Sequence, residues 1–349
     1  LRTIAVIGVP ADHYVGGAGS SQVDAVQPPV TVLEGIRDRV GRRTEVVYES
    51  GRNVARAAQA AADADVAVVV AADREGEDRD RRCLSLRSWC MPPSLLDADG
   101  PGPDYGNQDA LIRKVAAAQS DTVVVLETGG PVLMPWADRV PAIVEGWYPG
   151  QEGGTAIARV LFGDVNPSGH LPITFPAHER DPATDRASHR ERYPGILGTA
   201  RYSEGVLVGY RHYDSHGIKP TFPFGHGLSY TRFAYDRLRV RRRPRSHGLT
   251  IRVDVTNTGR RRGAEVVQTY LGMPDASARV TQPPKWLRAF DKVHLRPGQT
   301  KRVTMRLNRR DLAYWNAGQN SWAVADGTYQ VMVGRSSRDI RLRTRTRVD

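Results

Sequence analysis

Two apolar runs constrain the fold of this chain more than any other feature. Asp65 to Ala72 reads DVAVVVAA and Val123 to Leu126 reads VVVL, with no polar residue at alternate positions. A strand that is apolar on both sides must be buried on both faces, which is typical of parallel sheets covered by helices. The sequence therefore predicts an α/β fold.

Further strands and helices alternate around these runs. Strands are expected at Arg2–Val9, Thr44–Tyr48 and Ala142–Trp147, where short apolar runs end at Gly, Pro or polar residues. Segments with helical periodicity lie between them, at Pro29–Val40, Val54–Ala64, Asn107–Gln119 and Gln151–Phe162. In such sheets, ligands bind beyond the carboxyl ends of the strands.

The pattern changes to all-β from about Tyr235. Leu249 to Asn257 alternates with period two, and short strands separated by Gly, Pro and Asn continue to Val333. About seven strands in roughly 110 residues indicate a β-sandwich of the immunoglobulin or fibronectin type III kind. We predict an α/β sandwich domain at 1–176, a connecting segment that packs on it at 177–234, and a β-sandwich at 235–349.

The connecting segment gives weaker signals. Residues 176–200 are polar and without periodicity, which predicts a surface excursion, and Tyr202 to Tyr213 reads as a strand or a strand-like arm. His178, Glu179 and His189 lack the H-E-x-x-H spacing, so we expect no metal site.

The net charge is +12, and the densest basic cluster is Arg237–Arg245 (RLRVRRRPR). A solvated linker or strand edge is the favoured interpretation, because no aromatic residues are interleaved for base stacking. A patch that binds polyanions remains the alternative. No apolar run approaches the roughly 20 residues that a membrane span needs, so we expect neither a nucleic-acid partner nor a membrane partner.

Two loops follow the predicted strands. The Gly-rich loop Asp12–Ser21 fails the G-x-G-x-x-G fingerprint at Gln22, so no nucleotide cofactor is expected. The loop Asp73–Arg79 gathers charged side chains around Gly76 at a strand end. On the residues alone, a solvated charged loop is the simplest interpretation. The alternative is that Glu75, beside Asp78 and Arg79, is a catalytic carboxyl group.

Cys83 and Cys90 lie seven positions apart, and free thiols are favoured over a disulfide in a small loop. The chain enters a predicted strand directly after Leu1 without a signal peptide, which suggests a fragment or a processed product and favours the cytoplasm.

Three longer motifs carry a family resemblance. WYPGQEGG (147–154), LFGDVNPSGHLPITFP (161–176) and FPFGHGLSYTRF (222–233) resemble, in the same order, the C-terminal part of the family 3 glycoside hydrolases, which include β-glucosidases and β-xylosidases. The resemblance implies an α/β sandwich followed by a fibronectin-like domain. It also implies that the nucleophilic aspartate lies on a (β/α)8 barrel, to which nothing in these residues corresponds and which would act in cis or in trans.

The resemblance also implies a function for the charged loop. Glu75-Gly76-Glu77-Asp78-Arg79 is similar to the family's E-G-x-D-R loop, whose glutamate is the general acid/base of a retaining enzyme. Glu75 is therefore the catalytic candidate, Glu77 its rival and Glu204 a weaker one. Further residues are expected to bind the β-linked glycoside: Gly16, Gly17, Gly19, Asp78 and Arg79.

One departure concerns the segment between Leu84-Ser85-Leu86 and Gln108, which is longer than in the family and rich in Pro and Gly. It predicts either a functional lid or an insertion. We expect that this chain alone does not hydrolyse an aryl β-glucoside. The alternative function is a non-catalytic carbohydrate-binding or accessory protein that retains the fold.

Overall fold

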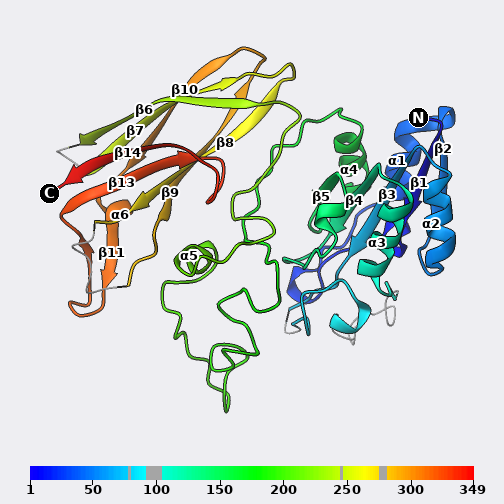
Figure 1. Ribbon diagram of the computed structural model, residues 1–349, viewed down its shortest axis with the longest axis horizontal. Coiled ribbons are helices and arrows are strands. Elements are labelled where there is room, and N and C mark those ends of the chain that lie inside the picture. Colours follow the sequence, from blue (N-terminus) through cyan, green and yellow to red (C-terminus); the bar gives the residue numbers. More distant parts are fainter. Residues whose placement is uncertain (78–79, 92–103, 244–246, 275–280) are drawn as a thin grey trace. The chain divides into compact units, whose positions relative to one another are not determined.

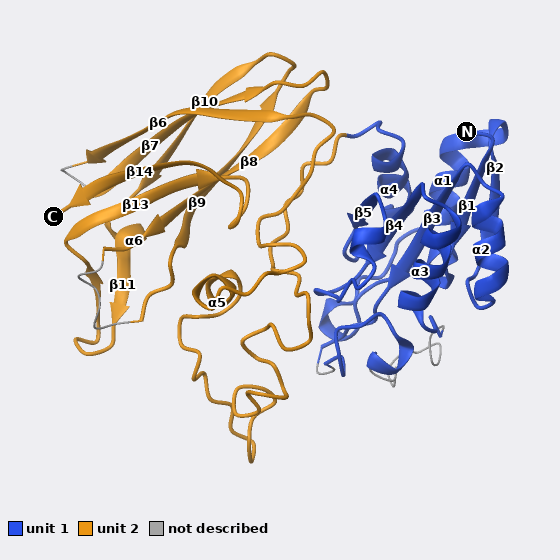
Figure 2. Ribbon diagram, viewed as in Figure 1, with its two compact units in different colours: residues 1–165 blue, residues 166–349 orange. Residues whose placement is uncertain are grey.

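The computed structural model describes residues 1–77, 80–91, 104–243, 247–274 and 281–349. The chain forms two compact units, Leu1–Val165 (unit 1) and Asn166–Asp349 (unit 2), shown in Figure 2. Asp78, Arg79 and residues 92–103 of the long segment lie outside the described residues. The three-part division expected from the sequence remains a prediction.

Unit 1 contains a five-stranded parallel sheet in the order β2-β1-β3-β4-β5, as Figure 1 shows. The strands are β1 (Thr3–Ile7), β2 (Glu45–Glu49), β3 (Val66–Ala72), β4 (Thr122–Glu127) and β5 (Ala142–Glu145). The central strands are almost entirely buried, which explains why their sequences do not alternate. The predicted α/β class is confirmed.

The helices of unit 1 begin at residues that cap them. Thr31 and Glu34 form a capping box at α1 (Val32–Val40), Asn53 caps α2 (Val54–Ala62), and Asn107 caps α3 (Gln108–Ala118). α1 packs against α4 (Gly153–Leu161), whereas α2 packs against α3. A core cluster joins Leu33 and Ile36 of α1 to Ile157 of α4 and to the strands.

Unit 2 contains the antiparallel sheets of the β-sandwich. One sheet has the order β10-β7-β6 and the other β14-β13-β8-β9, beside a small β11-β12 hairpin. Their core is a single cluster that includes Ile251, Val267 and Val331. The elements, drawn in Figure 1, are β6 (Phe233–Arg243), β7 (Gly248–Asn257), β8 (Gly263–Gly272), β9 (Trp286–Leu295), β10 (Thr300–Leu307), α6 (Arg309–Leu312), β11 (Ala313–Asn316), β12 (Ser321–Val324), β13 (Gly327–Gly334) and β14 (Ile340–Val348). The predicted β-sandwich class is confirmed.

One predicted element of unit 2 differs from the structure, and one strand was not predicted. Residues 202–213 do not form a strand: turns lead into a short helix, α5 (Tyr210–Ser215), because Gly205 and Gly209 take positive φ angles that break an extended path. Of the two interpretations favoured for the arginine cluster, a linker or a strand edge, the structure shows the strand edge, because β6 is an edge strand of the sheet β10-β7-β6. The described part of the cluster forms most of β6, and β14 is a second arginine-rich strand that the sequence did not predict.

Candidate active site

Acidic side chains gather at the carboxyl ends of three neighbouring strands in unit 1. Asp73 follows β3 directly and is fully buried, while Glu127 and Glu145 are the last residues of β4 and β5. β3 pairs with β4, and β4 with β5, in parallel register. The edge at which parallel sheets bind ligands is therefore rich in carboxyl groups.

Asp73 accepts hydrogen bonds from groups on two other segments. The Gly129 N–H and the Tyr148 hydroxyl both donate to its Oδ1, at 2.9 and 2.8 Å. The same Tyr148 hydroxyl accepts a hydrogen bond of 2.9 Å from the Glu75 N–H. Tyr148 thus connects the buried carboxylate to the backbone of the charged loop.

Arg81 bridges the two acidic side chains of this loop. Its Nη1 lies 3.0 Å from Asp73 Oδ2 and its Nε lies 2.6 Å from Glu75 Oε1. Its Nη2 donates to the Pro131 carbonyl at 2.6 Å. The Arg81 side chain is only 5% exposed, so its charge acts in a poorly solvated environment.

The segment after β4 closes tightly over Glu75. A Cβ atom at Gly129 would lie 2.8 Å from Glu75 Oε2 and 2.9 Å from a ring carbon of Tyr148, so a side chain there would displace Glu75 and Tyr148. Trp147, which precedes Tyr148, takes a φ of 55°. An L-residue is strained in this region, and the strand predicted to reach Trp147 ends instead at Glu145.

The Gly-rich loop lies against the charged loop. Ala18 forms an isolated parallel bridge with Gly76, in which the Ala18 N–H donates to the Glu75 carbonyl at 3.1 Å. The Glu77 N–H donates to the Ala18 carbonyl at 3.2 Å. Gly19 has a φ of 70°, and a Cβ there would lie 3.0 Å from Glu77 Cβ. The structure thus brings this loop, with Gly16 and Gly17, next to the Glu75 loop.

The two candidate glutamates have different environments. Burial, the largest cause, and the negative charge of Asp73 together raise the pKa of Glu75 to about 7, although Arg81 opposes this shift. Burial also raises the pKa of Asp73, but Arg81, Gly129 and Tyr148 stabilise its ionised form. This donor set favours the ionised form of Asp73, and so favours Glu75 as the protonated member of the pair. Glu77 is exposed, and its hydrogen bonds with Ser20 lower the pKa of its carboxyl.

The remaining carboxyl groups of this edge, Glu127 and Glu145, have raised pKa values, which favour their protonated forms. Burial raises the pKa of Glu127 to about 8. Burial likewise raises the pKa of Glu145 to about 8, although the Trp147 N–H and the Thr128 hydroxyl stabilise its ionised form. Neither group was singled out in the sequence.

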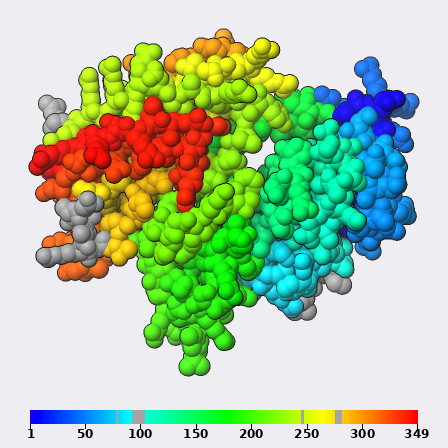
Figure 3. Space-filling view, viewed as in Figure 1, coloured from blue at the N-terminus to red at the C-terminus, as the bar shows by residue number. Residues whose placement is uncertain are grey.

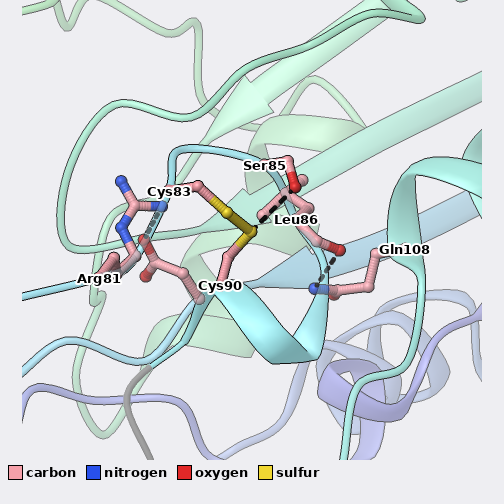
Figure 4. Close-up of a disulfide and its surroundings, with 7 residues drawn as sticks. Arg81, Cys83, Ser85, Leu86, Cys90 and Gln108 are labelled. Carbon is pink, nitrogen blue, oxygen red and sulfur yellow. Dashed lines mark hydrogen bonds and ion pairs between the residues drawn. A yellow bond between two sulfur atoms is a disulfide. The ribbon is translucent and has the colours of Figure 1, made fainter. Parts of the chain in front are cut away.

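The two cysteines form a disulfide, which corrects the preference for free thiols. Figure 4 shows that the Cys83–Cys90 bond and Arg81 belong to the same loop. The Arg82 N–H donates to the Cys90 carbonyl at 2.7 Å. The Gln108 N–H donates to Leu86, and the Gln108 side chain holds both backbone groups of Ala72, at 2.8 and 2.7 Å. The disulfide loop is therefore fastened to the end of β3.

Some predicted residues do not join this arrangement. Glu204 lies in unit 2, where its carboxylate is 3.6 Å from Arg192. Asp78 and Arg79 are outside the described residues. The sequence did not single out Arg81 or Tyr148, although Tyr148 lies within the WYPGQEGG motif. Within the described part of the chain, no group of three or more His, Cys, Asp or Glu residues could hold a metal ion.

Comparisons with known proteins agree with this architecture. Residues 1–230 match the model of the glycosyl hydrolase family 3 C-terminal domain, and residues 265–337 match that of a fibronectin type III-like domain. Among the described helices, none is long and apolar enough to cross a membrane.

The matching relatives are longer proteins. A thermostable β-glucosidase B from Acetivibrio thermocellus is 39% identical over 99% of this chain, which covers 45% of that protein. A β-glucosidase from Rhizobium radiobacter is 43% identical over 82% of this chain and 33% of its own length. A Streptomyces venezuelae β-glucosidase crystallised with D-glucose superposes with a TM-score of 0.89 at 31% identity, covering 99% of this chain and 56% of that one. The chain thus spans about half the length of these relatives or less.

Proposed function

This chain belongs to glycoside hydrolase family 3, and from that premise we propose that it supplies the general acid/base of a retaining β-glucosidase. The observation that carries the proposal is the arrangement of Glu75, Asp73 and Arg81 at the carboxyl end of β3. The relatives named as β-glucosidases support a β-linked glucoside or oligosaccharide as the substrate. The nucleophile would come from a barrel in cis or in trans.

Glu75 has the properties that this chemistry requires. A general acid must be protonated at the working pH and must still release its proton readily, which a pKa of about 7 allows. Its carboxyl would protonate the leaving glycosidic oxygen and then, once ionised, accept a proton from the water that releases the sugar. Arg81 would stabilise the ionised form in that second step, because its Nε contacts Glu75 Oε1.

Asp73 and Tyr148 would position the acid rather than touch the substrate. The ionised Asp73 raises the pKa of Glu75, and the Tyr148 hydroxyl accepts the Glu75 N–H and so fixes the start of the loop. Gly129 leaves room for the carboxyl group, because any side chain there would meet Glu75 Oε2. Gly16, Gly17 and Gly19 remain candidates for sugar binding, since their loop pairs with this one.

The environments of the two glutamates favour Glu75 over its rival. Glu77 is exposed, and its carboxylate accepts a hydrogen bond of 3.2 Å from the Ser20 N–H. Its hydrogen bonds with Ser20 lower the pKa of Glu77, which favours its ionised form, and they connect Glu77 to the Gly-rich loop. In the chain joined to a barrel, Glu75→Gln should lower the hydrolysis rate of a glucoside with a poor leaving group by about 10²- to 10⁴-fold. Glu77→Gln should change the rate little. Equal losses in both variants would reject the assignment.

We also propose that the chain by itself does not hydrolyse aryl β-glucosides, because it would lack the nucleophile. Turnover by the purified chain that Glu75→Ala abolishes would overturn this statement. The alternative is a carbohydrate-binding or accessory role. Binding of cello-oligosaccharide to the chain alone, unchanged in Glu75→Gln, would favour it.

The disulfide gives information about the cellular compartment of the protein. Disulfides persist mainly in oxidising compartments, so the Cys83–Cys90 bond argues against the cytoplasm that the sequence favoured.

A further inference from the structure

One face of the β-sandwich in unit 2 carries an array of arginines that the proposed chemistry does not use. A small pocket on the sheet β10-β7-β6 is lined by five arginines and one threonine: Arg237, Arg239, Arg241, Thr250, Arg252 and Arg302. In strand register, Arg239 lies opposite Arg252, and Arg241 lies opposite Thr250. Like charges placed directly opposite each other destabilise a sheet, so a bound anion would relieve this repulsion.

One buried carboxylate offsets part of this charge. Asp254 contacts Arg302 at 2.7 Å and Arg237 at 3.3 Å, and these guanidinium groups, with Arg239, lower the pKa of its carboxyl. By contrast, Arg239, Arg241 and Arg252 are exposed and form no ion pair with any described residue. Three guanidinium groups therefore present unused donors to a ligand.

The neighbouring strand extends the basic surface. β14 is an edge strand of the other sheet and lies beside β6. It carries exposed arginines at alternate positions, among them Arg343 and Arg345, which also form no ion pair within the described chain. In Figure 3, the red side chains of β14 and the yellow-green side chains around β6 lie next to each other on the face shown. Alternate residues of a strand are about 6.7 Å apart, and paired strands such as β6 and β7 lie about 4.8 Å apart. The donors thus form a grid rather than a single anion site.

We propose that this arginine face, defined as the exposed arginines that line the pocket on β6, β7 and β10, binds a linear polysaccharide that carries carboxylate groups. Guanidinium groups recognise carboxylates through paired hydrogen bonds, and a grid suits an anion repeated along a chain. No aromatic side chain lines the described pocket, whereas proteins that bind single-stranded nucleic acids use aromatic stacking. The face would hold a polymer independently of the Glu75 assignment.

Polygalacturonate binding to the full chain tests the proposal, with a neutral cellulose derivative and single-stranded DNA as comparators. The test variant is Arg239→Ala/Arg241→Ala/Arg252→Ala. The matched control, Arg190→Ala/Arg201→Ala/Arg296→Ala, removes three exposed arginines elsewhere that have no ion pair in the described chain, and so causes the same change in net charge. Arg241→Glu provides a second variant that remains informative if the triple variant fails to fold.

We expect the wild type to bind polygalacturonate with an affinity that falls steeply with salt, and the test variant to bind about tenfold more weakly. The control should change the affinity less than twofold. Equal losses in test and control variants would show that only net charge acts, and would overturn the proposal. Equal binding of the neutral polymer, or tighter binding of the DNA, would also overturn it.

Discussion

Replacing Arg81 by Met should destabilise unit 1 far more than the loss of an ordinary surface arginine. The Arg81 side chain is 5% exposed and contacts both Asp73, which is 1% exposed, and Glu75, which is 30% exposed. Glu75 can take up a proton when the guanidinium is lost. Asp73 would either keep an uncompensated buried charge or bind a proton, and both outcomes lower the free energy of unfolding. Breaking such a buried pair from one side costs about 3–5 kcal/mol.

Hydrogen exchange of the full chain measures this loss where it occurs. Peptides that cover β3 and β4 report the opening of unit 1, and 3 kcal/mol corresponds to an exchange rate faster by more than about 100-fold. Arg56→Ala is the matched control, because Arg56 is 71% exposed and pairs with Glu49 in the same unit. Its loss should cost less than about 1 kcal/mol.

A second variant separates the effect of the unpaired Asp73 charge from the effect of losing the packing of the Arg81 side chain. In Asp73→Asn/Arg81→Met no buried charge remains unpaired, so much of the lost protection should return. If Arg81→Met exchanges no faster than Arg56→Ala, or if the double variant is worse than Arg81→Met alone, the reasoning about a buried, charge-bridging arginine is refuted.

The other predictions concern the same sheet edge. Cys83→Ala/Cys90→Ala should lower the free energy of unfolding of unit 1 by about 2 kcal/mol, and a reductant should cause a similar loss in the wild type but none in the variant. Glu127 and Glu145 have raised pKa values of about 8. Their protonated forms therefore contribute fully to the free energy of unfolding below about pH 4.3. Between about pH 4.3 and pH 8, this contribution falls by about 1.4 kcal/mol per pH unit for each group. Glu127→Gln/Glu145→Gln should flatten this dependence in denaturation measured across that range, and an unchanged slope would contradict it. The Glu75 carboxyl resonance, identified by its loss in Glu75→Gln, should titrate in NMR near pH 7 rather than near pH 4.3.

The sheet of unit 1 could be predicted from the sequence because strands buried on both faces consist of uninterrupted apolar residues. Val66–Ala72 has no polar alternation, and the strand lies between β1 and β4. The same approach missed β14, whose sequence IRLRTRTRV alternates strictly but places arginine at every exposed position. The arginines dominate its composition, although a strand at the surface of a sandwich needs only one face in the core, which Leu342 and Val348 supply here.

The candidate site was predictable only in part. Glu75 followed from a local motif, whereas the residues that determine its pKa meet it through the fold. Tyr148 comes from a position 73 residues further along the chain, and Arg81 is separated from Glu75 by a stretch that includes residues 78–79, for which no structure is described. No pattern in the sequence indicates that Arg81 turns back to Asp73, because this depends on the disulfide loop and on the closure of Gly129 over Glu75.

Rescue by azide tests the central claim, that Glu75 is the acid/base, most directly. With the chain joined to a barrel and an aryl glucoside whose leaving group needs no protonation, Glu75→Ala should still form the glycosyl-enzyme but should no longer activate water. Azide needs no deprotonation, so its addition should restore turnover and yield β-glucosyl azide. Glu77→Ala should hydrolyse the substrate as the wild type does and give no azide product. Formation of β-glucosyl azide by Glu77→Ala, or undiminished hydrolysis by Glu75→Ala, would contradict the account.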